Sequence, residues 1–70
     1  MNTTVIVLLP IDNFERQEAN NLEHSEICQV TQNDLQIRGA EFYPISDFME
    51  MCNDESIDLT GHWLTYLKIE

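Results

Sequence analysis

Two apolar segments near the ends of the 70-residue chain give its clearest pattern. Residues Thr3–Leu9 form a continuous, β-branched apolar run that ends at Pro10, which is typical of a strand buried on both faces. Residues His62–Ile69 follow a break at Gly61 and have the same character. We therefore predict two central strands that pair with each other. In the second strand, alternation places Trp63, Leu67 and Ile69 on one face and Leu64 and Tyr66 on the other.

The middle of the chain has an alternation that fits a β-hairpin. With Asn33-Asp34 as a two-residue turn, Val30 lies opposite Ile37 and Cys28 lies opposite Gly39. One face then collects Cys28, Val30, Leu35 and Ile37, and the other collects Gln29, Thr31, Gln36 and Arg38. This clean separation of faces favours a hairpin between residues 28 and 39.

Residues 46–53 show the strongest helical pattern. Ser46 is a favourable N-cap, and it follows Pro44, which belongs outside a helix. At about 100° per residue, the apolar side chains gather on one side of this helix and the carboxylates on the other. We therefore predict an amphipathic helix that packs on one face of a sheet. Its apolar side is formed by Ile45, Phe48, Met49 and Cys52, and its acidic side by Asp47, Glu50 and Asp54.

Residues 12–26 have the weakest pattern. Phe14, Ala19 and Leu22 do not share one helical face, and the Asn pair at 20–21 indicates a turn. A short helix and a loop both fit this stretch. Taken together, the elements predict a single α+β domain, residues 1–70. Its small, mostly antiparallel sheet contains the N-terminal strand, the central hairpin and the C-terminal strand, with one amphipathic helix packed on one face.

The composition supports a folded domain despite its charge. The chain has 13 carboxylates and three basic side chains, which give a formal net charge of -10, yet 43% of its residues are hydrophobic. That hydrophobic content is ordinary for a globular domain and unlike that of a disordered chain. A chain of this length buries only about 60% of the surface that its unfolded form exposes. We therefore expect a small core and a strongly acidic surface.

The sequence also bears on location and on the state of the thiols. The N-terminus lacks the basic start and the cleavage site of a secretion signal, and the apolar run Val5–Leu9 is too short to span a bilayer. These features predict a cytoplasmic protein, located in the host cell if a phage encodes it. Cys28 and Cys52 are too few for a disulfide scaffold. We expect free thiols packed in the core, and a single bridge is the open alternative.

Motifs for catalysis or metal binding are absent from the sequence. There is no Gly-x-Ser-x-Gly element and no glycine-rich phosphate-binding loop. His24 and Cys28 are four residues apart, but Cys52 and His62 do not complete a zinc pattern. The segment Asp54–Asp58 lacks the ligand order of a calcium loop. We therefore predict a protein that is not an enzyme and that needs neither metal nor cofactor.

The carboxylates of the predicted helix suggest a use for the charge. Asp47, Glu50 and Asp54 are spaced i, i+3, i+7, so neighbours lie roughly 5–6 Å apart, a scale similar to that of phosphates along a DNA strand. The alternative is a plain solvated helix face. However, no Lys or Arg lies between Arg38 and Lys68, and carboxylates near a helix C-terminus cost stability. Both observations favour a binding role for the acids.

The sign of the charge selects the class of partner. A surplus of carboxylates repels nucleic-acid phosphates and anionic membrane surfaces, so we predict no direct binding to either. The expected partner is a basic protein surface, such as the groove of a nucleic-acid-binding protein, which this chain would occupy and inhibit as a nucleic-acid mimic. In general character, the chain resembles small acidic proteins of phages and mobile elements that inhibit restriction enzymes and CRISPR effectors (anti-restriction and anti-CRISPR proteins).

Ten carboxylates are the candidate partner-binding residues. The predicted helix and the segment after it contribute Asp47, Glu50, Asp54, Glu55 and Asp58, and the weakly patterned stretch contributes a second surface of Asp12, Glu15, Glu18, Glu23 and Glu26. The alternative function is an accessory module that binds a partner or a second copy, as a homodimer, through a sheet edge or an apolar patch. Steep weakening of binding by salt would distinguish mimicry from that alternative.

Overall fold

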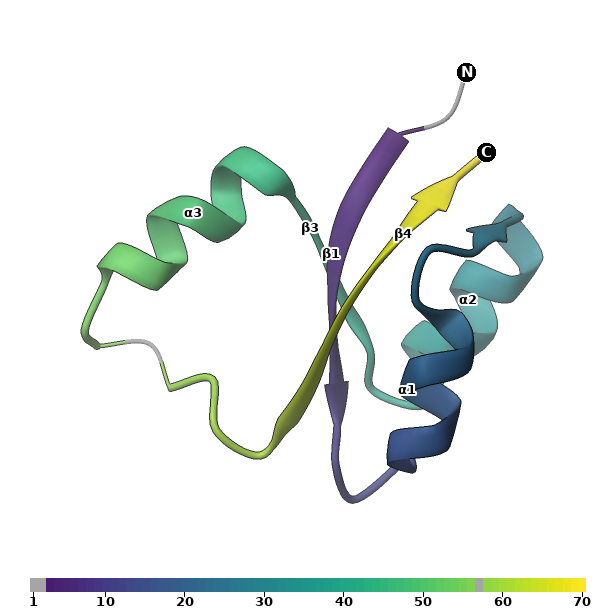
Figure 1. Ribbon diagram of the computed structural model, residues 1–70, viewed down its shortest axis with the longest axis horizontal. Helices are drawn as coiled ribbons and strands as arrows, with labels where there is room; N and C mark the ends of the chain where they lie inside the picture. Colours follow the sequence, from purple (N-terminus) through teal and green to yellow (C-terminus); the bar gives the residue numbers. More distant parts are fainter. Residues whose placement is uncertain (1–2, 57) are drawn as a thin grey trace.

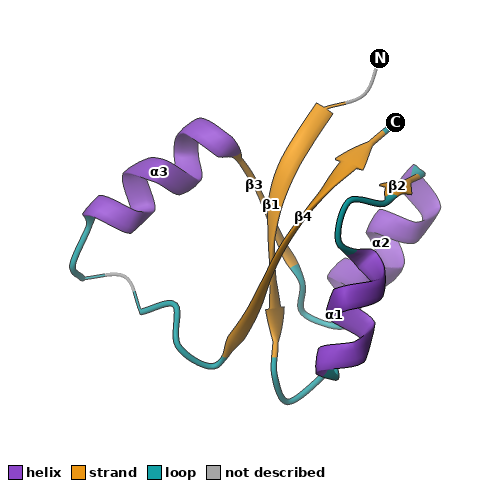
Figure 2. Cartoon of the chain, viewed as in Figure 1, coloured by secondary structure: helices purple, strands orange, loops and turns teal. Residues whose placement is uncertain are grey.

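In the computed structural model, which describes residues 3–56 and 58–70, three helices and a four-stranded sheet form the described part of the chain (Figures 1 and 2). The elements in chain order are β1 (Thr3–Pro10), α1 (Arg16–Leu22), β2 (Glu26–Ile27), α2 (Gln29–Ile37), β3 (Glu41–Pro44), α3 (Ile45–Asn53) and β4 (His62–Ile69). This architecture confirms the predicted α+β class.

The sheet has the order β2-β4-β1-β3, with β1 and β4 at its centre. These two strands pair antiparallel along their whole length, from Thr3 opposite Ile69 to Pro10 opposite His62. The prediction of two central strands that pair with each other is therefore confirmed. β3 pairs antiparallel with the other edge of β1, whereas β2 pairs parallel with β4. The sheet is thus mixed rather than purely antiparallel.

The main core lies between one face of the sheet and the helices α1 and α2 (Figure 1). Neighbouring residues of a strand face opposite ways, and Val7, Leu9 and Leu67 point to this side, where they are fully buried. The rest of the buried cluster comes from the helices, the strands and their flanking segments: Val5, Phe14, Ala19, Ile27, Leu35 and Ala40. Trp63 packs against the same cluster, and its Nε1 donates a hydrogen bond to the Phe14 carbonyl at 2.9 Å.

The predicted hairpin between residues 28 and 39 is wrong, because residues Gln29–Ile37 form helix α2. The hairpin register required Val30 and Ile37 to share a buried face, but these side chains are 69% and 84% exposed. Leu35 alone is buried within α2. The glutamines of this segment favour a helix. Because Val30 and Ile37 are exposed, the alternation of apolar and polar residues does not reflect a buried face of a sheet.

A Schellman motif ends α2 and identifies the stop signal. The N–H of Ala40 donates to the Leu35 carbonyl, and the N–H of Gly39 donates to the Gln36 carbonyl, at 3.0 and 2.9 Å. Gly39 has a φ of +98°, a conformation that glycine adopts without a Cβ penalty. Leu35 and Ala40, which flank this turn, are both buried. The glycine therefore ends a helix rather than pairing across a hairpin.

Residues 12–26 contain helix α1 and the approach to β2. Within α1, Ala19 is buried and Leu22 half-buried, so they share a face. Phe14 lies before the helix begins, which explains why its position does not fit the helical face. After α1 the chain runs along the edge of β4, where the N–H of His24 donates to the Tyr66 carbonyl at 2.9 Å. This stretch is thus part helix and part edge strand.

α3 lies on the opposite side of the sheet from α1 and α2 (Figure 1). It follows β3 directly and packs mainly against β1 and β3. The sheet face on this side carries Ile6, Leu8, Leu64 and Tyr66, which alternate with the core residues. Leu8 is only 3% exposed, whereas Leu64 is 57% exposed. This second face, with α3, residues 54–56 and residues 58–61, is called the α3 side below; it is covered over β1 and open over β4.

Candidate partner-binding surface

Half of the predicted binding residues gather on the α3 side. Asp47 and Glu50 belong to α3, Asp54 is its C-cap, and Glu55 and Asp58 lie in the segment that leads to β4 (Figure 1). All five are exposed. Asp54 does not continue the predicted helical row, because its backbone is extended, with φ −95° and ψ 105°. The acids therefore form one helical pair followed by an acidic loop.

The start of α3 is set by backbone rather than by a side-chain cap. Pro44, with φ −56°, occupies the N-cap position, and the helix begins at Ile45. The predicted N-cap, Ser46, is therefore wrong: it lies inside the first turn, and no side-chain cap hydrogen bond forms. A proline has its φ fixed near the helical value and lacks an N–H that would need a partner. Asp47 in the first turn is favoured by the helix dipole.

The orientation of α3 differs from the prediction. Phe48 is half-buried as expected, but Met49 is 62% exposed and Cys52 is also exposed. Met51 is half-buried instead, and no residue of α3 is fully buried. The helix is turned about its axis so that positions 48 and 51 face the protein. Its apolar stripe is therefore only partly covered, and Ile45 remains 45% exposed.

Two short turns orient two of the three acids after α3, Asp54 and Asp58. Oδ1 of Asp54 accepts hydrogen bonds from the Ser56 hydroxyl and N–H at 2.7 and 3.0 Å. Oδ1 of Asp58 accepts the same pair from Thr60 at 2.6 and 2.9 Å. These bonds, led by the hydroxyls, hold the pKa of each aspartate below its ordinary value. The donors of these bonds are neutral, so both loop acids keep their full negative charge.

Glu41 adds a sixth acid to the α3 side. It lies on β3 opposite Leu8, which places it on the second face of the sheet. Its Oε2 accepts a hydrogen bond from the Tyr43 hydroxyl at 2.6 Å, and this bond raises the pKa of Tyr43. The sequence from residue 39 to 67 contains these six acids and no Lys or Arg.

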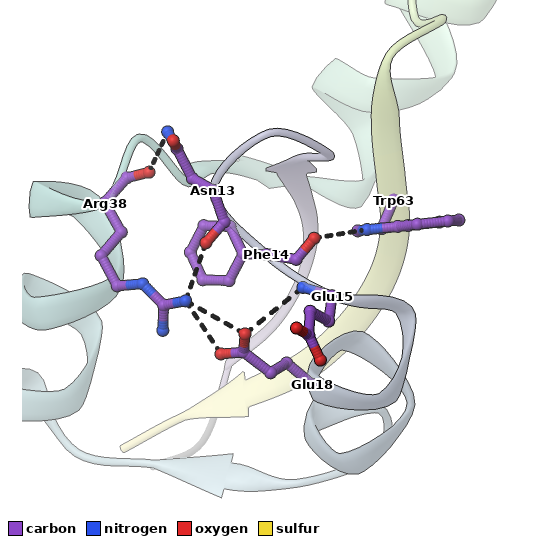
Figure 3. A network of polar contacts seen from close by, with 6 residues as sticks. All are labelled: Asn13, Phe14, Glu15, Glu18, Arg38 and Trp63. Carbon is purple, nitrogen blue, oxygen red and sulfur yellow. Dashed lines mark hydrogen bonds and ion pairs between the residues drawn. The ribbon is translucent and has the colours of Figure 1, made fainter.

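On the face of the sheet covered by α1 and α2, called the α1 side below, carboxylates bind other groups of the same chain (Figure 3). The Arg38 guanidinium lies 2.9 Å from Glu18 Oε2 and donates to the Asn13 carbonyl at 2.8 Å. It also stacks over Phe14, 4.1 Å from the ring centroid. Glu18 in turn accepts the N–H of Glu15 at the start of α1. The Arg38 side chain, and then the Glu15 N–H, hold the pKa of Glu18 below its ordinary value.

The second predicted surface is therefore mixed in sign. Glu18 is paired with Arg38, and Glu23 lies 3.9 Å from His24 Nε2. Asp12, Glu15 and Glu26 are exposed, but Arg16 belongs to the same helix as Glu18. Two of these five acids, Glu15 and Glu18, cap the start of α1, and Glu18 also fastens it to Arg38. The structure does not bring them together as a uniformly acidic patch.

The prediction that both thiols pack in the core is wrong. Cys28 and Cys52 are free and exposed. Cys28 occupies the N-cap position of α2, and its Sγ lies 3.5 Å from the Thr31 hydroxyl. The Thr31 side chain, followed by nearby N–H groups, lowers the pKa of this thiol. The prediction placed Cys28 on the apolar face of a hairpin, but this hairpin does not form. It placed Cys52 on the buried face of the helix, but α3 is turned so that Cys52 is exposed.

Sequence reasoning missed the open strip of β4. Leu64 and Tyr66 were placed correctly on one face, but the strand was expected to be buried on both faces. They are 57% and 38% exposed. The Tyr66 hydroxyl lies 2.9 Å from His24 Nε2, and the two rings meet edge to face with centroids 4.4 Å apart. The sequence did contain a signal for this exposure, because only one helix was predicted and one helix cannot cover both faces of the sheet.

The remaining structural observations concern pockets, metal ligands and membrane-spanning helices. The described residues, 3–56 and 58–70, contain no detectable pocket and no group of three side chains that could hold a metal ion. Within the same residues, no helix has the length and apolar character to cross a membrane. Comparisons with protein-family models, curated proteins and solved structures found no match. The surface of the described residues is therefore the basis from which a function is inferred.

Proposed function

We propose that this protein is a stoichiometric inhibitor that binds the basic nucleic-acid groove of a partner protein through its α3 side. The observation that carries the proposal is the run of six exposed carboxylates between residues 39 and 67 without a Lys or Arg among them. Carboxylates at this density attract a lysine- and arginine-rich groove and speed encounter with it. The mechanism is competition, in which carboxylates take the place of phosphates.

The hydrogen bonding of these acids supports the proposal. Asp54 and Asp58 are oriented by neutral Ser56 and Thr60, so their positions are restrained while their charge remains available. Restrained groups lose less conformational freedom when they pair with a partner. On the α1 side, in contrast, Arg38 neutralises Glu18. The partner class is a nucleic-acid-binding protein, and restriction enzymes and CRISPR effectors are the examples that a phage protein would target.

The test is competition against DNA with charge-reversed variants. A partner is recovered from host lysate at low salt and eluted with rising salt, and its complex with labelled duplex DNA is then titrated with this protein. Displacement of the DNA supports the proposal. The double variant Asp47→Lys with Glu50→Lys should weaken displacement about tenfold or more, equivalent to roughly 1.4 kcal/mol.

A matched control makes the same change of charge at two acids outside α3 and the loop that follows it. Asp12→Lys with Asp34→Lys alters two exposed acids away from α3, so it should displace DNA nearly as well as the wild type. Equal losses in the two double variants would show that net charge acts without a defined surface. Normal displacement by the α3 variant would show that the α3 side is not the binding surface.

A further inference from the structure

Leu64, Tyr66 and Ile6 form an apolar strip on the α3 side. Binding through carboxylates alone would leave this strip without a role. Leu64 and Tyr66 are 57% and 38% exposed on the same face of β4, and Ile6 is half-buried opposite Tyr66. We propose that this strip anchors the apolar face of a cationic amphipathic segment of the partner protein. The inference rests on the proposed function, because it places the basic partner on the same α3 side.

Tyr66 is suited to be an anchor because its ring is already held. Its hydroxyl meets His24 Nε2 at 2.9 Å, and the two rings pack edge to face. An aromatic side chain that is fixed before binding gives a large contact area at little cost in conformational entropy. Leu64 stands two residues away on the same face and is the more exposed of the two. Together they form an exposed apolar contact, and the described residues contain no pocket.

The distribution of charge decides which occupant fits this strip. A second copy would bring the same acids, Glu41, Asp47, Glu50, Asp54, Glu55 and Asp58, against themselves, with a formal charge of -10 on each chain. Like charges across an interface disfavour that contact. A cationic segment meets the opposite sign. Lys68 lies at the far end of the strip, opposite Glu26 on β2, so the cations of the partner should face the acids of the loop that leads into the other end of β4, such as Asp58.

The experiment uses two synthetic lysine-rich peptides of equal length and charge. One has leucines along one helical face, and the other has serines in their place. If the strip anchors apolar side chains, the wild-type protein should bind the leucine peptide about tenfold more tightly, the gain expected for burying one large aliphatic side chain. Binding is measured by fluorescence anisotropy at low and at physiological salt.

Two matched variants test the location of the contact. Leu64→Ser removes the exposed leucine of the strip, and Ile37→Ser removes an isoleucine that is 84% exposed on α2, on the other side of the sheet. Leu64→Ser should abolish the preference for the leucine peptide without changing the affinity for the serine peptide. Ile37→Ser should keep the preference. Circular dichroism and thermal melting check that both variants fold.

The outcomes separate this inference from the proposed function. Equal affinity of the wild type for the two peptides overturns the apolar anchor but leaves charge-based binding intact. No binding to either peptide contradicts both. A preference that survives Leu64→Ser, or that Ile37→Ser removes equally, places the contact elsewhere and overturns the inference. A dimer in analytical ultracentrifugation that Leu64→Ser dissociates would show that a second copy occupies the strip, which also overturns it.

Discussion

The two sides of the sheet bury apolar surface to very different extents. On the α1 side, Leu67 is fully buried, and α1 and α2 each contribute a buried side chain, Ala19 and Leu35. On the α3 side, no residue of α3 is buried, and Leu64, three residues before Leu67 on the same strand, is 57% exposed. The α1 side therefore has the character of a core, and the α3 side that of a surface available for contact.

The two sides also differ in how they use charge. Arg38 on the α1 side joins Glu18, the Asn13 carbonyl and the Phe14 ring, so opposite charge there fastens the fold. On the α3 side, the hydrogen-bond donors to Asp54 and Asp58 are hydroxyls and N–H groups, which leave the negative charge in place. A small chain can thus concentrate stability in one layer and present its charge in another.

The largest expected effect compares two leucines of β4. Leu67→Ala removes a fully buried side chain and should lower the free energy of unfolding by about 2–5 kcal/mol. Leu64→Ala changes a side chain that is 57% exposed, and it should cost less than about 1 kcal/mol. Urea denaturation followed by circular dichroism measures both. Similar losses would mean that the two sides contribute equally to stability, and the comparison would fail.

A smaller effect, of opposite sign, is expected at Thr65. This residue is 3% exposed, and its hydroxyl has no hydrogen-bond partner in the part of the chain that the structure describes. Thr65→Val replaces the hydroxyl with a methyl group of similar size and should raise the free energy of unfolding by about 1 kcal/mol. Thr65→Ser, which keeps the hydroxyl and loses the methyl, should be less stable than the wild type. A destabilised valine variant would reveal a partner for the hydroxyl.

The smallest effect concerns the pH dependence of stability on the α1 side. The pKa of Glu18 is lowered from 4.5 in the folded state, mainly by the Arg38 side chain. A lowered pKa contributes stability above the unfolded value of 4.5, which is lost as the pH falls through the folded pKa. Thermal melts of wild type and Glu18→Gln should therefore differ at neutral pH and converge in acid. A constant difference across this range would contradict the assigned role of the Arg38 pair.

The sequence was sufficient to predict the two strands at the centre of the sheet, β1 and β4. β1 has a continuous β-branched apolar run, and β4 is rich in aromatic and aliphatic residues after the break at Gly61, both of which are typical of strands. α2 was missed because most of its apolar side chains stay in solvent, so their spacing carried no information about burial. Gly39 held the relevant signal, since a glycine just after a helical segment is a common C-terminal stop. β2 is too short, at two residues, to produce any pattern.

The arrangement of the candidate acids in the fold could be predicted only in part, for similar reasons. The acids around α3 could be identified because no basic residue interrupts them in the sequence. The pairing of Glu18 with Arg38 could not be inferred, because the two residues are 20 positions apart and meet only after α1 and α2 pack on the sheet. The exposure of Leu64 depends on where α3 lies across the sheet, which the helix pattern does not determine.

The pairing of Thr3 with Ile69 has a consequence for synthesis of the chain. β1 leaves the ribosome before the other described elements, and β4, which pairs with it along its whole length, leaves after them. Until then the nascent protein lacks Leu67 and Trp63, so the layer against α1 and α2 stays incomplete, and closing such a long loop costs entropy. The layer against α1 and α2 can therefore close only after β4 has left the ribosome.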